Sequence, residues 1–128
     1  MTEKMTIQAC AAQVALPPST LRYYERKGLM PPVARDENGH RLYSEDDVHW
    51  INFVKCMRQT GMPLKEIRAF GVLHFGRGSV RERVDILTHH HARMAAQQDE
   101  LAKAMDFIGN KIARFEAFLA RTEGLGEA

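Results

Sequence analysis

The residues with the clearest chemical potential are basic and aromatic, and they stand close together in the first half of the chain. An arginine and two tyrosines occupy residues 22–24, and a second group of basic and aromatic residues follows at 40–43. Arginine reads guanine edges and binds phosphates, and tyrosine hydroxyls bond to the DNA backbone. No Ser/His/Asp arrangement, phosphate-binding glycine loop or H-E-x-x-H sequence accompanies them, so we expect neither enzymatic activity nor a cofactor.

Cysteine is the second reactive residue type. Cys10 and Cys56 are too few for a disulfide framework, which fits a reducing cytoplasm. Lys55 and Arg58 lie close to Cys56 in the sequence, and a nearby cation favours the reactive thiolate. The alternative is that Cys56 is a small buried side chain in a helix. Cys10 stands in an alanine-rich stretch and is expected to fill the core.

Three consecutive histidines, residues 89–91, raise the question of a metal site. Neighbouring residues of a helix point about 100° apart, so these three side chains cannot ligate one ion together. We therefore predict no metal ligands, and a metal response through histidines is kept only as an alternative.

The elements that position the basic residues begin with two short helices. The apolar stretch Ile7–Val14 is long enough for one helix, and the prolines at 17 and 18 interrupt it. Pro18 is suited to open a second helix, over Ser19–Lys27, which Gly28 would end. Helix, tight turn and helix form the supersecondary unit of many DNA-binding proteins.

A β-hairpin and two further helices are predicted next. Asn38-Gly39 favours a type I′ turn with both residues at positive φ, pairing Ala34–Arg35 with Arg41–Leu42. Ser44 and the acids after it indicate a helix start, and that helix is expected to run to about Thr60. Pro63 then opens a helix over residues 64–72.

The clearest periodicity lies in the second half. Ser79 and Glu82 form a capping box, and a helix over residues 80–121 would be about 63 Å long. The head cannot cover so long a seam, so we expect a second copy of the chain to bury it, with its two polar members fixing register. The seam residues follow heptad spacing: Val84, Leu87, His91, Met94, Gln98, Leu101, Met105, Ile108, Ile112, Phe115 and Leu119.

Length and composition fit this organisation. The 128 residues make one small domain with an appended element, which we place at 1–75 for the head and 76–128 for the linker and long helix. Hydrophobic residues at 45% and charged residues at 27% are ordinary for a soluble chain, and no apolar run could span a membrane. The net charge is only +2, so positive charge must be concentrated locally if the chain binds DNA.

Three segments carry a resemblance to a known family. The run from Ser19 to Leu29, STLRYYERKGL, resembles the recognition helix of MerR-type bacterial transcription regulators. The run NGHRLYS at 38–44, with the acids after it, is similar to the wing and third-helix start of that family. The run GMPLKEI at 61–67 is similar to its fourth-helix entry. Together the resemblance covers residues 5–70.

The resemblance implies a mostly α fold, with a winged helix-turn-helix head and a long antiparallel coiled-coil dimerisation helix. It implies a homodimer that binds a palindromic double-stranded promoter with a long spacer, and distorts the DNA so that RNA polymerase can engage it. The DNA contacts it assigns are Ser19, Thr20, Arg22, Tyr23, Arg26, His40, Arg41, Tyr43 and Lys65, with Lys55 and Arg58 as further phosphate contacts.

The resemblance also bears on what is sensed. Metal sensors of the family carry cysteines beyond the dimerisation helix and drug sensors carry an extra domain, and neither is found in this sequence. Residues 53–64 resemble the NmlR/AdhR subgroup, which responds to reactive aldehydes and related electrophiles, and this assigns the sensor role to Cys56. An architectural DNA-bending protein without an effector is the other alternative.

Overall fold

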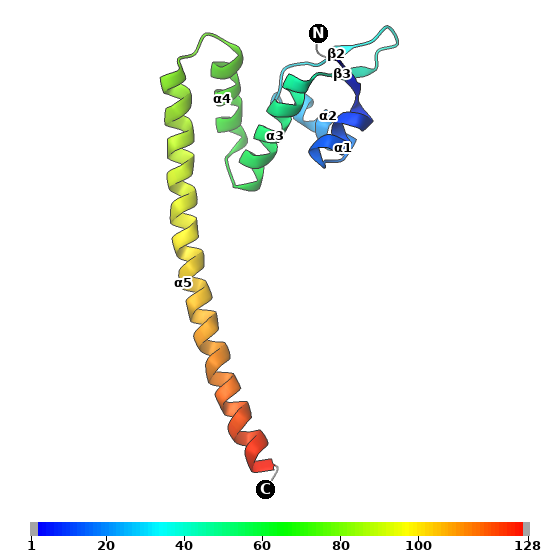
Figure 1. The fold of residues 1–128 in the computed structure, drawn as a ribbon. Coiled ribbons are helices and arrows are strands. Elements are labelled where there is room, and N and C mark those ends of the chain that lie inside the picture. The colour runs from blue at the N-terminus through cyan, green and yellow to red at the C-terminus, as the bar shows by residue number, and fades with distance from the viewer. Residues whose placement is uncertain (1–2, 127–128) are drawn as a thin grey trace. The chain divides into compact units, whose positions relative to one another are not determined.

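A computed structural model describes residues 3–126, which form five helices and three short strands (Figure 1). The contacts divide the chain into a head that extends to Leu87 and a second unit that begins at Thr88, so the boundary lies within the last helix. The elements are β1 (Met5–Thr6), α1 (Ile7–Val14), α2 (Pro18–Arg26), β2 (Ala34–Arg35), β3 (Arg41–Tyr43), α3 (Glu45–Gln59), α4 (Leu64–Phe75) and α5 (Val80–Gly126).

The predicted helix-turn-helix is confirmed, and its turn contains no glycine. Thr6 caps α1, with its Oγ1 accepting a hydrogen bond from the Ala9 amide at 3.2 Å. Ala15 ends α1 in the left-handed conformation, at φ 55° and ψ 47°. Alanine pays a steric cost there that glycine would not. Gly28, at φ 71°, follows α2 as predicted.

The wing is a three-stranded antiparallel sheet in the order β1-β3-β2. The predicted pairing is confirmed, since Ala34 lies opposite Leu42 and Arg35 opposite Arg41. Strand β1 was not expected. It pairs Met5 with Tyr43.

The turn of this hairpin differs from the predicted type I′. Gly39 has a φ of 80°, whereas Asn38 is not in the left-handed region. The carboxylate of Asp36 closes the turn instead, because its Oδ1 accepts from the amides of Asn38 and His40, each at 2.9 Å. An aspartate that bonds to the backbone two residues onward is a common turn former.

Helices α3 and α4 begin where the sequence predicts. Ser44 forms a capping box with Asp47, in which each side chain accepts from the other residue's amide. Helix α4 continues three residues beyond the expected end and stops at Phe75, before Gly76.

The core of the head is built from one face of each helix. Trp50 lies in it, and its indole Nε1 donates to the Leu29 carbonyl at 2.7 Å. Cys10 is buried, as predicted, and Tyr24 is buried as well. Ile86 and Leu87, from the start of α5, pack against the same core.

Helix α5 has 47 residues and is therefore about 70 Å long. Within the second unit, one row of large apolar side chains is 51–64% exposed, which leaves a long apolar face uncovered by the chain itself. No helix of the described residues has the length and apolar character that a membrane span requires. The members of this row, called the α5 stripe below, are Leu101, Met105, Ile108, Ile112, Phe115 and Leu119.

Candidate nucleic-acid interface

The exposed face of α2 carries the side chains predicted to read DNA. Leu21 and Tyr24 turn into the core, so Ser19 and Arg22 are left exposed on the opposite side, and Thr20 is half-buried. Arg22 lines a hollow of about 390 Å³, together with residues of β1, α1 and the wing. The structure therefore brings the recognition helix and the wing to one surface.

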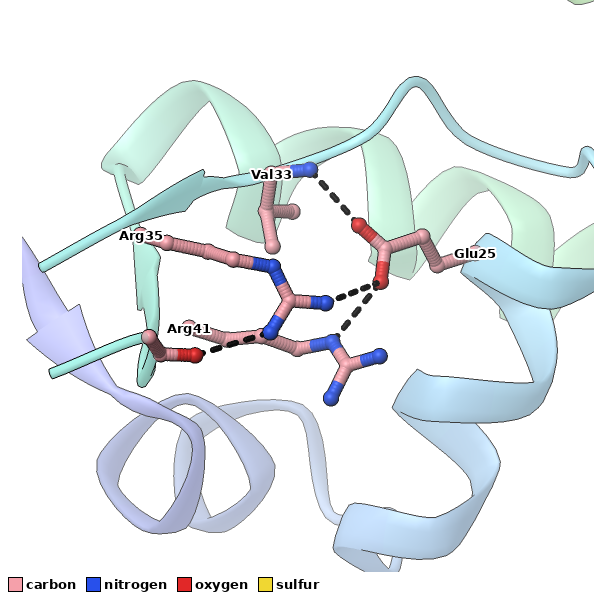
Figure 2. A network of polar contacts seen from close by, with 5 residues as sticks. Glu25, Val33, Arg35 and Arg41 are labelled. Carbon is pink, nitrogen blue, oxygen red and sulfur yellow. Dashed lines mark hydrogen bonds and ion pairs between the residues drawn. The ribbon is translucent and has the colours of Figure 1, made fainter.

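Glu25 joins that helix to the wing (Figure 2). Its Oε1 accepts from Arg41 Nε at 2.7 Å and lies 3.9 Å from Arg35 Nη2. Its Oε2 accepts from the Val33 amide at 2.8 Å. Arg35 Nη1 in turn donates to the Gly39 carbonyl at 2.8 Å, so the network reaches the wing turn.

This network perturbs the acidity of Glu25. Burial alone would raise the pKa of the Glu25 carboxyl, but the Val33 amide and the guanidinium groups of Arg41 and Arg35 hold that pKa below its usual value. Glu25 is therefore a carboxylate at neutral pH, and it fixes Arg41, which lines the same hollow as Arg22.

The wing turn has a second electrostatic contact. His40 Nδ1 lies 3.4 Å from the Asp36 carboxylate, and the His40 side chain is well exposed. The His40 amide, and then the other donors to Asp36, lower the pKa of that carboxyl. His40 is thus presented at the tip of the wing, as a DNA contact requires.

One predicted contact is wrong. Tyr43 was expected to touch the DNA backbone, but its side chain is 0% exposed and lies in the core. Burial raises the pKa of its hydroxyl, which has no hydrogen-bond partner within residues 3–126. The physical reason is strand alternation, since pairing with Met5 of β1 places Tyr43 on the inner face of the sheet.

The remaining predicted contacts lie at the surface. Tyr23 is half-buried, and Lys27 Nζ lies 6.0 Å from its ring centroid. Arg26 is exposed on the last turn of α2, and Lys65 is exposed on the first turn of α4. Arg58 is exposed on α3, whereas Lys55 Nζ donates to the Val14 carbonyl at 2.8 Å and so holds the end of α1.

Two side chains that hold α2 in place were not expected, namely Glu25 and Arg68. Arg68 is exposed on α4, and its Nε donates to the Lys27 carbonyl at 3.0 Å, at the C-terminal end of α2. Charge complementarity between Glu25 and the hairpin arginines was the available signal for the first. No signal in the sequence predicted the Arg68 contact, because Arg68 and Lys27 are 41 residues apart in the chain.

The two cysteines are in opposite environments. Cys56 is exposed on α3, and Thr60 Oγ1 donates to its carbonyl at 2.8 Å. Cys10 is fully buried, and burial, followed by the charge of Asp47, raises the pKa of its thiol to about 11. Both are free thiols, and Cys56 is the accessible one.

The histidine run of α5 contains one buried member. His90 is 3% exposed, with Arg93 Nη2 2.8 Å from its Nδ1, whereas the seam residue His91 is exposed within the chain. Across residues 3–126, no three His, Cys, Asp or Glu side chains gather as metal ligands would.

Comparison with known proteins gives two overlapping family matches. Residues 5–70 match the model described as "MerR HTH family regulatory protein", and residues 48–109 match "MerR, DNA binding". Together they cover the head and the first part of α5.

Similar sequences are themselves regulators. The HTH-type transcriptional regulator AdhR of Bacillus subtilis is 42% identical over 91 residues, which make up 70% of this chain and 65% of AdhR. An uncharacterized HTH-type transcriptional regulator of Haemophilus influenzae is 30% identical over 112 residues, covering 87% of this chain and 83% of that protein.

Solved structures agree in fold. HiNmlR, a MerR family regulator lacking the sensor domain and bound to promoter DNA, superimposes with a TM-score of 0.79 at 29% identity, covering 89% of this chain and 91% of that one. A MerR family transcriptional regulator from Bacillus thuringiensis gives a TM-score of 0.78 at 27% identity, covering 88% and 99%. These relatives are regulators and not enzymes. The head, the wing and both family matches lead to one conclusion: the chain belongs to the MerR family of DNA-binding transcriptional regulators.

Proposed function

We propose that two copies of the chain pair through α5 and bind a palindromic promoter with a long spacer. The dimer distorts that DNA so that RNA polymerase engages both promoter elements. Cys56 then makes the activity responsive to reactive aldehydes or related electrophiles in the cytoplasm. The observation that carries the proposal is the combination of a DNA-binding head with the uncovered α5 stripe.

Dimerisation is supported by the stripe and its spacing. Its six members recur every three or four residues, and each is at least half exposed in the single chain. Burial of apolar area yields roughly 25 cal/mol per Å², so a second α5 gains several kcal/mol by covering such a row. An antiparallel pair is proposed, as in the expected coiled coil, with both heads presented to one DNA.

DNA distortion is supported by the stiffness of the reading surface. Glu25 ties Arg41 to α2, and Asp36 closes the wing turn, so helix and wing hold one geometry. When a rigid protein surface contacts phosphates that are some distance apart, the free energy of those contacts can offset the cost of bending the DNA between them. HiNmlR, which is similar in fold to this chain, is bound to promoter DNA in its crystal structure.

The DNA part is tested with a dimer-breaking variant. Ile108→Glu places a charge in the stripe, whereas Asn110→Glu places the same charge on the opposite face of α5 and serves as the control. We expect Ile108→Glu to lower the sedimenting mass and to abolish footprinting and transcription from a long-spacer promoter. A variant that stays dimeric, or a monomer that still activates, contradicts the proposal.

Cys56 is proposed as the sensor because it is exposed and Cys10 is not. Its thiolate would add to the carbonyl carbon of an aldehyde, forming an S–C bond while the oxygen takes up a proton. A promoter–reporter strain is challenged with formaldehyde or methylglyoxal, using wild type, Cys56→Ser and the control Cys10→Ala. Loss of induction in Cys56→Ser alone is expected.

An unchanged response of Cys56→Ser would move the sensing role elsewhere. If no electrophile changes transcription in any variant, the effector-independent DNA-bending alternative is favoured.

A further inference from the structure

An aromatic pocket lies within the head, between α3 and α4, and its lining includes none of the residues assigned to DNA. Its volume is about 500 Å³, within the range of sites that hold small organic ligands. Asp46 and His49, on the first two turns of α3, complete the lining. The aromatic members of the lining are Trp50, Phe53, Phe70, His74 and Phe75.

The rings of this pocket lie nearly parallel. The Trp50 ring is inclined by 24° to Phe53, 22° to Phe70 and 17° to His74, with centroids 5.1, 6.0 and 5.1 Å away. Phe75 meets Trp50 edge-on, at 4.8 Å and 72°. These rings cover one another, and Trp50 is only 6% exposed, whereas Phe75 is 53% exposed and presents an accessible ring. A flat occupant suits such a ring, because aromatic pairs prefer offset-stacked or edge-to-face contact.

The central ring is held in place before any ligand arrives. The buried indole Nε1 of Trp50 donates to the Leu29 carbonyl at 2.7 Å, which fixes the plane of the ring. A wall that does not have to be ordered on binding lowers the entropic cost of association.

The charge of the lining favours a cation. Asp46 brings the one carboxylate of this lining, it is exposed, and it makes no hydrogen bond or ion pair with the residues that the structure describes. No Lys or Arg is among the lining residues. Arg83 Nη1 lies 3.3 Å from His74 Nδ1, but Arg83 does not line the pocket. The faces of aromatic rings also attract cations.

We propose that this pocket binds a planar organic cation of about the size of a two-ring aromatic, stacked against the Trp50 cluster with its charge toward Asp46. The site is separate from Cys56, which does not line it, and gives the regulator a second ligand. The proposal does not depend on the electrophile response.

Trp50 makes the test direct, because it is the chain's single tryptophan. The full-length protein is titrated with N-methylquinolinium, and with 1-methylnaphthalene as a neutral analogue of the same shape. Fluorescence lifetime separates static from collisional quenching, and calorimetry gives the dissociation constant. We expect saturable static quenching by the cation, with affinity at least about fivefold above that of the neutral probe.

Two substitutions locate the charge and the ring contact. Asp46→Asn should weaken binding of the cation roughly fivefold and leave the affinity for the neutral probe unchanged. Glu45→Gln removes a neighbouring carboxylate that does not line the pocket, so it should stay within about twofold of wild type. Phe53→Leu keeps most of the side-chain volume but removes one aromatic ring from the lining. It should therefore lower the affinity for both probes. Circular dichroism verifies that each variant is folded.

Three outcomes would overturn the proposal. The first is the absence of saturable binding. The second is equal affinity for both probes with no effect of Asp46→Asn, which would describe an apolar hollow. The third is an affinity that falls as protein concentration rises, which would mean that a second copy of the chain occupies the pocket.

Discussion

Glu25 and Arg41 form a 2.7 Å ion pair between the recognition helix and the wing. The side chains of Glu25 and Arg41 are 13% and 24% exposed, so solvent screens the pair only in part. The same carboxylate accepts from the Val33 amide, so one side chain ties α2 to both the start and the end of the hairpin segment (Figure 2).

Glu25→Gln should therefore lower the free energy of unfolding by about 1–3 kcal/mol, since it leaves the Arg41 guanidinium without its charged partner. Denaturant titration of the purified protein measures this. Arg35→Gln is the matched comparison. Arg35 lies 3.9 Å from Glu25 and is half-exposed, so its loss should cost less than about 1 kcal/mol. Equal losses in the two variants would contradict the ranking.

The pH dependence of stability should reveal the same carboxylate. The pKa of Glu25 is lowered in the folded protein, so the unfolded chain binds more protons near the ordinary glutamate pKa of about 4.3. The Glu25 carboxylate therefore stabilises the folded state above that pH, and this stabilisation is lost as the pH falls through the pKa that Glu25 has in the folded protein. The stability of wild type should thus decline more steeply than that of Glu25→Gln from about pH 5 downward. Parallel curves would argue against this role.

Ala15→Gly should stabilise the head. Ala15 is exposed and holds φ 55°, where a side chain costs about 1–2 kcal/mol and glycine costs nothing. The greater freedom of glycine in the unfolded chain offsets part of this, so we expect a net gain of about 0.5–1 kcal/mol. Ala12→Gly, on an exposed position inside α1, should instead lose about 0.5–1 kcal/mol. Thermal unfolding of both variants tests the opposite signs.

Arg22→Ala should weaken binding to the promoter by about 1–3 kcal/mol if Arg22 reads a base, with relaxed specificity at that base pair. Arg121→Ala, near the C-terminal end of α5 and in the other unit, removes the same charge and should leave affinity unchanged. Fluorescence anisotropy with matched and mutated operators measures both. If the two variants lose affinity equally and without change in specificity, Arg22 contributes general charge only.

Native alkylation should separate the two thiols. Cys56 is exposed, whereas Cys10 is fully buried with a thiol pKa of about 11. Iodoacetamide reacts with thiolates, so Cys56 should react at least on the order of tenfold faster than Cys10. Peptide mass spectrometry over time gives both rates, and denaturant should remove the difference. Comparable rates in the folded protein would show that Cys10 becomes accessible in solution.

The sequence by itself determined the local elements. Proline positions, the Ser44 cap, Gly28 and the Asn-Gly hairpin act within a few residues, so the helices and the 34–42 pairing followed from them. The apolar periodicity of α5 was likewise readable, because heptad spacing needs no knowledge of the rest of the fold.

Tertiary structure decided what depends on distant partners. Strand β1 forms by pairing with β3, with Met5 opposite Tyr43 and Thr6 opposite Leu42. Tyr43 lies on the buried side of this sheet, against the predicted DNA contact. The hydrogen bonds of Glu25 to Val33 and Arg41 join residues that lie far apart in the sequence. The aromatic pocket between α3 and α4 is also formed by residues from separate parts of the chain. Sequence periodicity determines which face of an element is apolar. The pairing partner of a short strand, and the side of the sheet on which its residues lie, depend instead on the other segments of the chain that pack against it.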